Sequence, residues 1–283
     1  MMENQKTKTI RAVIFDWAGT VVDFGCFAPI YGLVEAFQAF GVDVSLDAAR
    51  RDMGLAKRDH IRKLLSLQSV EEAFRTAHGR SSTESDIDKI HEHLETGLLS
   101  RLRDFAAPID GVVDMVDKLT SAGIQVGSTT GYTRPMMDVI LPIAMEAGYR
   151  PQAVVTPSEV PTGRPAPWMC YENAKRLGIY PMDRLVKVGD TLVDIDEGRN
   201  AGMWTVGVIE GSNLLGLSQS DVMTMPQSDL ILRKKHVRQQ MVHRGADLVI
   251  DRIVDLPDAI LSIEQALDIG GRPGEGQREL AQA

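Results

Sequence analysis

Apolar residues along the chain follow two patterns: short uninterrupted runs, and longer stretches in which they recur every three or four residues. A short run is typical of a strand buried on both faces, and the repeat is typical of a helix. Over most of the chain the two patterns alternate, which predicts an α/β protein with a Rossmann-like, doubly wound parallel sheet. The runs that predict strands are residues 13–15, 124–130, 153–156, 184–190, 203–209 and, as a short edge strand, 247–251.

One long region between the first two predicted strands contains helical patterns only. Apolar residues recur at helical spacing from Ile30 to Phe40, a basic stretch runs from Leu55 to Leu67, and a further helical pattern follows Thr83. An all-helical insertion of this size is a candidate second domain. We therefore predict a core domain over residues 1–24 and 106–267, a helical domain over 25–105, and a disordered tail over 268–283, where the periodicity is lost.

Two segments of the insertion predict the start of a helix. Ser69-Val-Glu-Glu72 has the spacing of a capping box, in which a hydroxyl residue is followed three positions later by an acidic one, and Thr83-Glu-Ser-Asp86 opens a longer helix. The second helix carries an apolar stripe that we expect in the core: Ile87, Ile90, Leu94, Leu98 and Leu102.

Polar residues gather where the predicted strands end. Asp16 follows the first strand, Thr130 ends the second, Asp190 ends the fourth with Asp194 one turn later, and Arg164 lies in a Gly/Pro-rich loop. The carboxyl ends of parallel strands share one edge of the sheet, where ligands bind. Each residue alone has a simpler interpretation, because Asp16 or Thr130 could cap a helix and Arg164 could be a surface cation. Together, two carboxylates, a hydroxyl and a cation suit a Mg²⁺-assisted phosphoryl-transfer site.

This arrangement resembles the haloacid dehalogenase superfamily of phosphotransferases, whose four motifs match Asp16-Trp-Ala-Gly-Thr20, Thr130, Arg164, and Gly189-Asp190-Thr191 with Asp194. The resemblance covers residues 9–24 and 106–260 of the core. It implies that Asp16 is a nucleophile that forms an aspartyl-phosphate. It also implies that the helical insertion is a cap that closes over the site.

Ala18 departs from the superfamily pattern. Phosphatases of the superfamily carry a second Asp at this position, which protonates an alkoxide leaving group, whereas this chain has Ala. One interpretation is an inactive relative kept as an interaction scaffold. The other is an enzyme whose leaving group is not an alkoxide.

The basic stretch of the insertion offers a candidate for the second interpretation. By its position alone, Lys57 is one of several cations, and a solvated role is the simpler explanation. Yet the chain resembles the phosphonatase family of this superfamily through several segments. These are Asp16-Trp-Ala-Gly-Thr20, Phe24-Gly-Cys-Phe-Ala-Pro29, Met53-Gly-Leu-Ala-Lys57 with His60, Gly127-Ser-Thr-Thr-Gly-Tyr132, and Gly163-Arg-Pro-Ala-Pro-Trp168.

That resemblance implies hydrolysis of the phosphorus–carbon bond of phosphonoacetaldehyde, in 2-aminoethylphosphonate degradation, by a homodimer that uses part of the cap's apolar stripe as its interface. A Mg-dependent phosphomonoesterase or phosphomutase, or an inactive scaffold, remains the alternative. The resemblance implies that Asp16 and Lys57 are the catalytic residues, with Lys57 forming a Schiff base. It implies that one Mg²⁺ per subunit is bound by Asp16, Asp190 and the Ala18 carbonyl, and that the phosphonate is bound by Thr130, Gly131 and Arg164. Supporting residues would be Met53, His60, Tyr132, Cys26 and Asp194.

Composition narrows the class of partner. The net charge of −8 argues against nucleic acid or an anionic membrane as the main partner. Two cysteines, Cys26 and Cys170, cannot form a disulfide framework. The polar N-terminus lacks the apolar core of a signal peptide, and no apolar run approaches the ~20 residues needed to span a bilayer. We therefore expect a cytoplasmic protein with a small-molecule substrate.

Overall fold

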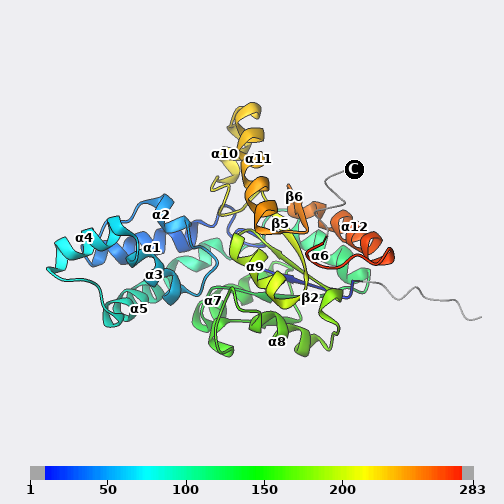
Figure 1. Cartoon of the computed structure of the whole chain (residues 1–283), viewed down its shortest axis with the longest axis horizontal. Coiled ribbons are helices and arrows are strands. Elements are labelled where there is room, and N and C mark those ends of the chain that lie inside the picture. Colours follow the sequence, from blue (N-terminus) through cyan, green and yellow to red (C-terminus); the bar gives the residue numbers. More distant parts are fainter. Residues whose placement is uncertain (1–9, 276–283) are drawn as a thin grey trace, which may run out of the picture.

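The structure, a computed structural model, describes residues 10–275 and contains a six-stranded parallel sheet with the order β3-β2-β1-β4-β5-β6 (Figure 1). Every strand lies within or overlaps a predicted run, and the predicted edge strand β6 is at an edge, so the predicted sheet is confirmed. The strands are β1 (Ala12–Phe15), β2 (Gln125–Thr129), β3 (Ala153–Val155), β4 (Leu185–Gly189), β5 (Trp204–Val208) and β6 (Leu248–Ile250).

Helices cover both faces of the sheet because β1 and its neighbours are apolar on both sides. Val13 and Phe15 belong to the large hydrophobic cluster that includes residues of α6, α7 and α12, whereas Ile14 packs with residues of α8. Successive side chains of a strand point to opposite faces, so an unbroken apolar run needs this double cover. The core helices are α6 (Val112–Ser121), α7 (Arg134–Glu146), α8 (Trp168–Leu177), α9 (Leu192–Ala201), α10 (Gln219–Thr224), α11 (Gln227–Arg244) and α12 (Leu256–Asp268).

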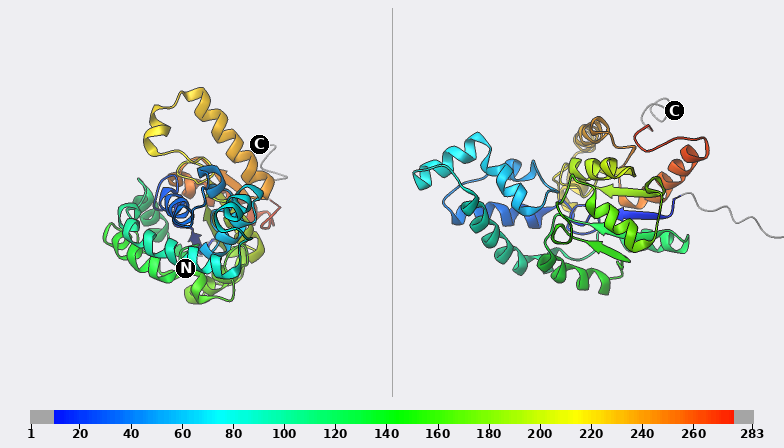
Figure 2. Two further views of the ribbon diagram at one scale, coloured as in Figure 1. Left: turned by 90° about the vertical axis from the view of Figure 1, so that its left-hand side faces the viewer. Right: turned by 60° about the horizontal axis from the view of Figure 1, so that its bottom comes forward.

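The helical insertion lies beyond the carboxyl end of β1, to one side of the sheet (Figures 1 and 2). Its predicted apolar stripe, from Ile87 to Leu102, is buried within the chain, and Leu94 and Leu98 lie against Gly32 of α1. These stripe residues are therefore not free to form a dimer face, and the homodimer itself stays a prediction. The insertion consists of α1 (Phe27–Ala39), α2 (Leu46–Arg50), α3 (Lys57–Leu65), α4 (Gln68–His78), α5 (Glu84–Arg101) and a 3₁₀ turn at Leu102–Phe105.

The two predicted helix starts have different outcomes. At the start of α5, the Asp86 carboxylate accepts hydrogen bonds from the backbone N–H of Thr83 at 2.8 Å and from its hydroxyl at 2.7 Å, so this prediction is confirmed. The box at Ser69 is wrong, because α4 begins at Gln68 and Ser69 lies inside its first turn. The spacing alone does not exclude a helix that begins a residue or two earlier.

We expect Asp86→Asn to lower the free energy of unfolding by about 1–2 kcal/mol at pH 7, because it removes the cap and the Arg80 ion pair. Hydrogen bonds from Arg80 hold the pKa of Asp86 well below its usual range. A lowered pKa contributes stability above the unfolded-state value of about 4, and this contribution is lost as the pH falls. Denaturant unfolding should therefore show a wild-type advantage at pH 7 that shrinks below pH 4. A constant difference across this range would contradict it.

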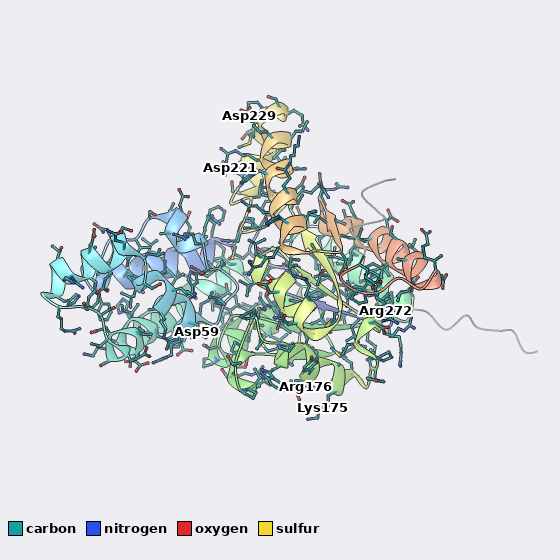
Figure 3. The ribbon with its side chains drawn as sticks, in the orientation of Figure 1. Asp59, Lys175, Arg176, Asp221, Asp229 and Arg272 are labelled. Atoms are coloured by element: carbon teal, nitrogen blue, oxygen red, sulfur yellow. The ribbon has the colours of Figure 1, made fainter. Side chains whose placement is uncertain are left out.

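The segment between β5 and β6 was not predicted to be helical. It forms α10 and the long α11, which project from the core, with Asp229 near the tip and Asp221 below it (Figure 3). The predicted disordered tail begins at residue 268, which is the last residue of α12. Within the described part of that tail, the backbone N–H of Gly274 donates to Asp247 at 2.6 Å. Residues 276–283 lie outside the described residues.

None of the described helices is both long and apolar enough to cross a membrane.

Candidate active site

Two buried carboxylates meet at the carboxyl edge of the sheet. Asp16 follows β1 and Asp190 follows β4, and the parallel pairing of these neighbouring strands brings the two side chains together. Asp190 accepts a hydrogen bond of 2.7 Å from the backbone N–H of Asn213. Burial, and then the nearby Asp16 and Asp194 charges, raise the pKa of Asp190 well above its usual value. Burial also raises the pKa of Asp16, although the Arg164 guanidinium opposes this effect.

Asp194, one turn into α9, is held by two cations. Its Oδ1 lies 3.0 Å from Arg164 Nη1 and 2.9 Å from Lys187 Nζ, and its Oδ2 accepts a 2.6 Å hydrogen bond from the Thr191 hydroxyl. Burial alone would raise the pKa of Asp194, but these cations outweigh it and the pKa is lowered. Both oxygens have partners already, so Asp194 is placed to orient its neighbours.

The carboxylate cluster fits a divalent cation. Oxygen atoms of Asp16, Asp190 and Asp194 all lie within 4.8 Å of one another. Buried carboxylates this close repel each other unless a positive charge offsets them, and hard cations such as Mg²⁺ prefer carboxylate and carbonyl oxygens. Asp16 and Asp190 are the candidate ligands, together with the backbone carbonyl of Ala18, a residue that lines the adjoining cavity.

Arg164 forms the cationic wall of the site. Its buried guanidinium donates from Nη2 to Asp16 Oδ1 and to Thr129 Oγ1, each at 2.7 Å, and from Nε to Glu197 at 2.9 Å. These hydrogen bonds and the ion pair from Nη1 to Asp194 fix the guanidinium in one orientation, because a planar group held at three nitrogens has little rotational freedom. The predicted convergence of Arg164 with Asp16 is therefore present in the structure.

Two charged groups behind Arg164 are absent from the predicted site. Lys187 Nζ donates to Thr129 Oγ1 at 3.0 Å, and the Thr129 hydroxyl donates to Glu197 Oε2 at 2.9 Å. Two signals in the sequence could have identified them. Lys187 interrupts an apolar strand three residues before Asp190, and Glu197 follows Asp194 by three residues on one helix face.

Thr130 and Gly131 follow β2 at the same edge. Thr130 is buried, and its Oγ1 accepts a 3.0 Å hydrogen bond from the backbone N–H of Tyr132. Gly131 touches the insertion closely. A Cβ at this position would come within 2.5 Å of the carbonyl oxygen of Leu55 and 3.0 Å of that of Gly54. Only a residue without a side chain allows this approach.

We expect Gly131→Ala to reduce kcat/KM about 10- to 100-fold, because the added methyl group displaces the segment that leads to Lys57. Steady-state kinetics would measure the loss. Gly97→Ala is the matched control, since a Cβ on Gly97 meets nothing within 4 Å. Equal activity of the two variants would show that the close approach has no functional part.

Lys57 enters the site from the insertion. It is the first residue of α3 and is only 4% exposed, although the sequence alone favours a solvated role. It lines one cavity of about 20 Å³ together with Asp16, Ala18, Thr130 and Arg164. Burial lowers the pKa of Lys57; Cys26 and Asp16 oppose this effect, and Arg164 adds to it. A buried lysine with a lowered pKa is a stronger nucleophile at neutral pH than a solvated one.

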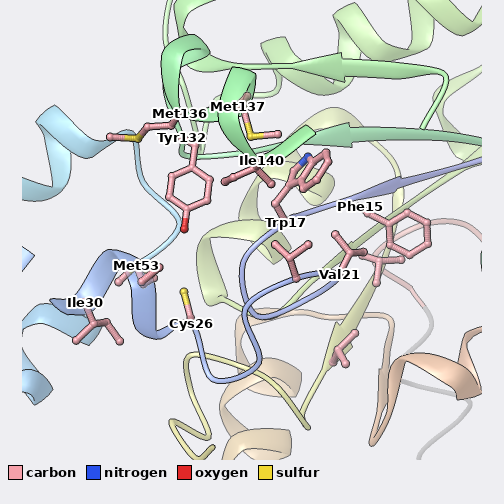
Figure 4. Packing of buried hydrophobic residues seen from close by; sticks show 14 of the residues in the cluster. Phe15, Trp17, Val21, Cys26, Ile30, Met53, Tyr132, Met136, Met137 and Ile140 are labelled. Atoms are coloured by element: carbon pink, nitrogen blue, oxygen red, sulfur yellow. The ribbon is translucent and has the colours of Figure 1, made fainter. Parts of the chain in front are cut away.

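Three of the predicted supporting residues surround the amine. Met53 Sδ lies 3.8 Å from Lys57 Nζ, and Nζ lies 5.0 Å from the centroid of the Tyr132 ring. Cys26 lines the same cavity from the start of α1. Figure 4 shows Met53, Cys26 and Tyr132 facing one another from three separate segments.

His60 is buried but does not line this cavity. Burial, and then the neighbouring Lys57 charge, lower its pKa to about 3, so the imidazole is neutral at physiological pH. A neutral His60 one turn from Lys57 adds no positive charge beside the amine.

The model of the haloacid dehalogenase-like hydrolase family matches residues 10–202, which hold all the carboxylates of the cluster. This chain belongs to that family of hydrolases. Haloacid dehalogenase-like hydrolases similar to it include the phosphonoacetaldehyde hydrolase of Bacillus cytotoxicus, which is 49% identical over 90% of this chain and 97% of that protein. The chain is thus similar over most of its length to proteins named phosphonoacetaldehyde hydrolase.

Two further proteins of this family are similar. The bifunctional phosphonoacetaldehyde hydrolase/aminoethylphosphonate transaminase of Clostridioides difficile is 45% identical over 90% of this chain and 40% of that protein. The crystal structure of a phosphonoacetaldehyde hydrolase-like protein from Oleispira antarctica superposes with a TM-score of 0.92 at 35% identity, covering 94% of this chain and 96% of that one. The Rossmann-like haloacid dehalogenase core inferred from the motifs is thereby confirmed.

Proposed function

We propose that this chain hydrolyses the phosphorus–carbon bond of phosphonoacetaldehyde to give acetaldehyde and phosphate. The observation that carries the proposal is the shared cavity, which both Lys57 and Asp16 line while position 18 has no carboxylic acid. The names of the most similar relatives support the same substrate.

A phosphorus–carbon bond needs an electron acceptor because a carbanion is a poor leaving group. The Lys57 amine condenses with the aldehyde and takes up one proton, releasing water and forming an iminium ion. Its lowered pKa supplies the unprotonated amine that this step requires. The iminium then accepts the electron pair of the breaking bond, and the organic fragment leaves phosphorus as an enamine. An enamine leaving group needs no proton from position 18, which accounts for Ala18.

Asp16 attacks phosphorus as that bond breaks, giving an aspartyl-phosphate. Arg164 donates to Asp16 Oδ1 and so holds the carboxylate in one orientation, and its charge attracts the phosphonate dianion. Thr130 and Gly131 offer a hydroxyl and a backbone N–H to the phosphoryl oxygens. A divalent cation held by Asp16, Asp190 and the Ala18 carbonyl would neutralise charge on the phosphoryl group. The enamine takes up a proton and is hydrolysed to acetaldehyde, which frees Lys57, and water releases phosphate from Asp16.

Reduction with borohydride tests this function directly. With phosphonoacetaldehyde and Mg²⁺, the wild-type protein is expected to release phosphate and acetaldehyde in equal amounts. Added borohydride should stop the reaction and attach the reduced adduct to Lys57, which peptide mass spectrometry would detect. Lys63, exposed on the same helix, is the internal control. Full turnover with an unmodified Lys57 would exclude the Schiff base.

The two alternatives predict different results in the same assay. A phosphomonoesterase or phosphomutase would act on sugar phosphates and not on phosphonoacetaldehyde, and an inactive scaffold would act on neither. The proposal also includes the source of the substrate, which is 2-aminoethylphosphonate degradation. Fusion of such a hydrolase to an aminoethylphosphonate transaminase in the Clostridioides difficile relative supports a substrate that comes from 2-aminoethylphosphonate.

A further inference from the structure

Arg50 and Asn213 join the helical insertion to the core through reciprocal hydrogen bonds. Arg50 is the last residue of α2, and Asn213 lies in the loop after β5. Arg50 Nη1 donates to Asn213 Oδ1 at 3.2 Å and to the Asn213 backbone carbonyl at 3.4 Å. In return, Asn213 Nδ2 donates to the backbone carbonyl of Arg50 at 2.9 Å. The contact therefore depends on both side chains.

The surroundings of Arg50 are shaped to receive its guanidinium. Nη1 also donates to the carbonyl of Gly25 at 2.9 Å, and Cζ lies 5.0 Å from the centroid of the Phe27 ring. A Cβ on Gly216 would lie only 3.2 Å from Arg50 Nε, so the loop closes tightly around the side chain. Among residues 10–275, no carboxylate forms an ion pair with Arg50. Its partners are carbonyl and amide oxygens and an aromatic face, which require a specific fit.

Each end of this contact continues into the active site. The backbone N–H of Asn213 donates to Asp190 Oδ2 at 2.7 Å. From Arg50, the chain runs through Met53 and Gly54, both of which line the cavity, to Lys57. One pair of side chains thus connects the segment that carries the amine with the loop that holds a carboxylate.

We propose that Arg50 and Asn213 are positioning residues that clasp the insertion onto the core and bring Lys57 and Asp190 into place together. The inference deepens the proposed function and rests on it. Neither side chain lines the cavity, so neither touches the reacting atoms. When the clasp is broken, the catalytic groups remain present but the insertion spends more time away from the core.

A double-mutant cycle tests whether the two residues act as a unit. Asn213→Ala keeps the backbone N–H to Asp190 and removes only its contact with Arg50. Arg50→Met keeps the stem beside Phe27 but also loses the hydrogen bond to Gly25, so Asn213→Ala is the more specific of the two variants. Each single variant should lose about 10- to 100-fold in kcat/KM for phosphonoacetaldehyde, and the double variant should lose no more than the worse single one. Independent, additive losses would overturn the proposal. Arg101→Met is the matched control, because Arg101 pairs with Glu35 at 2.7 Å within the insertion.

The rate at which Lys57 is acylated tests the Arg50–Asn213 contact without any assumption about the substrate. A water-soluble acetylating ester, followed by peptide mass spectrometry, should label the buried Lys57 slowly in the wild type, relative to the exposed Lys63. Arg50→Met and Asn213→Ala should each raise the ratio of Lys57 labelling to Lys63 labelling about fivefold or more, because they favour local opening of the insertion. The milder Asn213→Ser serves where either variant does not fold.

The outcomes separate the two proposals. Unchanged labelling of Lys57 in the folded variants overturns the clasp, whatever their activity. Increased labelling in the variants supports the clasp even where the wild-type protein releases no phosphate from phosphonoacetaldehyde, a result that would overturn the proposed function alone.

Discussion

Asp16→Asn is expected to abolish phosphate release from phosphonoacetaldehyde, with a loss of about 10⁴-fold or more in kcat, because an amide cannot attack phosphorus. The variant separates the two halves of the proposed reaction. Lys57 reaches the cavity from the insertion, and the Asp16 charge opposes the lowering of the Lys57 pKa, so loss of that charge leaves the amine no less nucleophilic. Borohydride should therefore still trap an adduct on Lys57 in Asp16→Asn, while free phosphate stays at the background level.

Asp114→Asn provides the control for this variant, because it makes the same substitution at an exposed position of α6. It should retain full activity. The role of Asp16 as nucleophile would be refuted by an Asp16→Asn protein that releases phosphate at more than a few per cent of the wild-type rate.

Lys57→Arg is expected to remove phosphorus–carbon hydrolysis almost completely, by about 10³-fold or more, because a guanidinium keeps the charge but cannot form an iminium. The substitution thus distinguishes covalent chemistry from simple attraction of the phosphonate. Phosphate release is the measurement, and adduct formation should be lost with it. Retention of substantial activity in Lys57→Arg would show that the lysine acts only through its charge.

The pH dependence of the wild-type protein supplies an independent check on Lys57. Burial lowers the pKa of Lys57 below its ordinary value of 10.5, and the unprotonated amine is the reactive form. The value of kcat/KM should therefore rise with pH and level off below pH 10.5. A value of kcat/KM that continues to rise above pH 10.5 would indicate an ordinary, solvated amine.

The sheet was predictable from the sequence because its strands are short and most of them carry apolar residues on both faces. Val13, Ile14 and Phe15 form an unbroken run, and the carboxylates that follow such runs necessarily share one edge. The projecting helix α11 was not predictable in this way. Only Leu230, Val237 and Met241 are buried along its 18 residues, so it has no continuous apolar stripe to indicate a helix.

The residues of the candidate site also differ in how far the sequence predicts their positions. Asp16, Thr130 and Asp190 could be placed together by strand order alone, without reference to any relative. Lys57 could not, because its distance from Asp16 depends on how the insertion folds back onto the core. Only the motif resemblance indicated that contact. Lys187 escaped both kinds of reasoning, since a lysine in a strand is usually at the surface, and here it is enclosed by Asp194 and Glu197.

The volume of the cavity has a consequence for the timing of the reaction. About 20 Å³ is room for roughly one water molecule, far less than an aldehyde that carries a phosphonate group. The cavity as it stands is too small for this substrate, so we expect the two parts of the protein to separate for substrate entry and product exit. Each catalytic cycle then includes at least one such excursion, and its frequency is a ceiling on turnover however fast the bonds rearrange. Raising solvent viscosity would slow the enzyme in proportion wherever that ceiling applies.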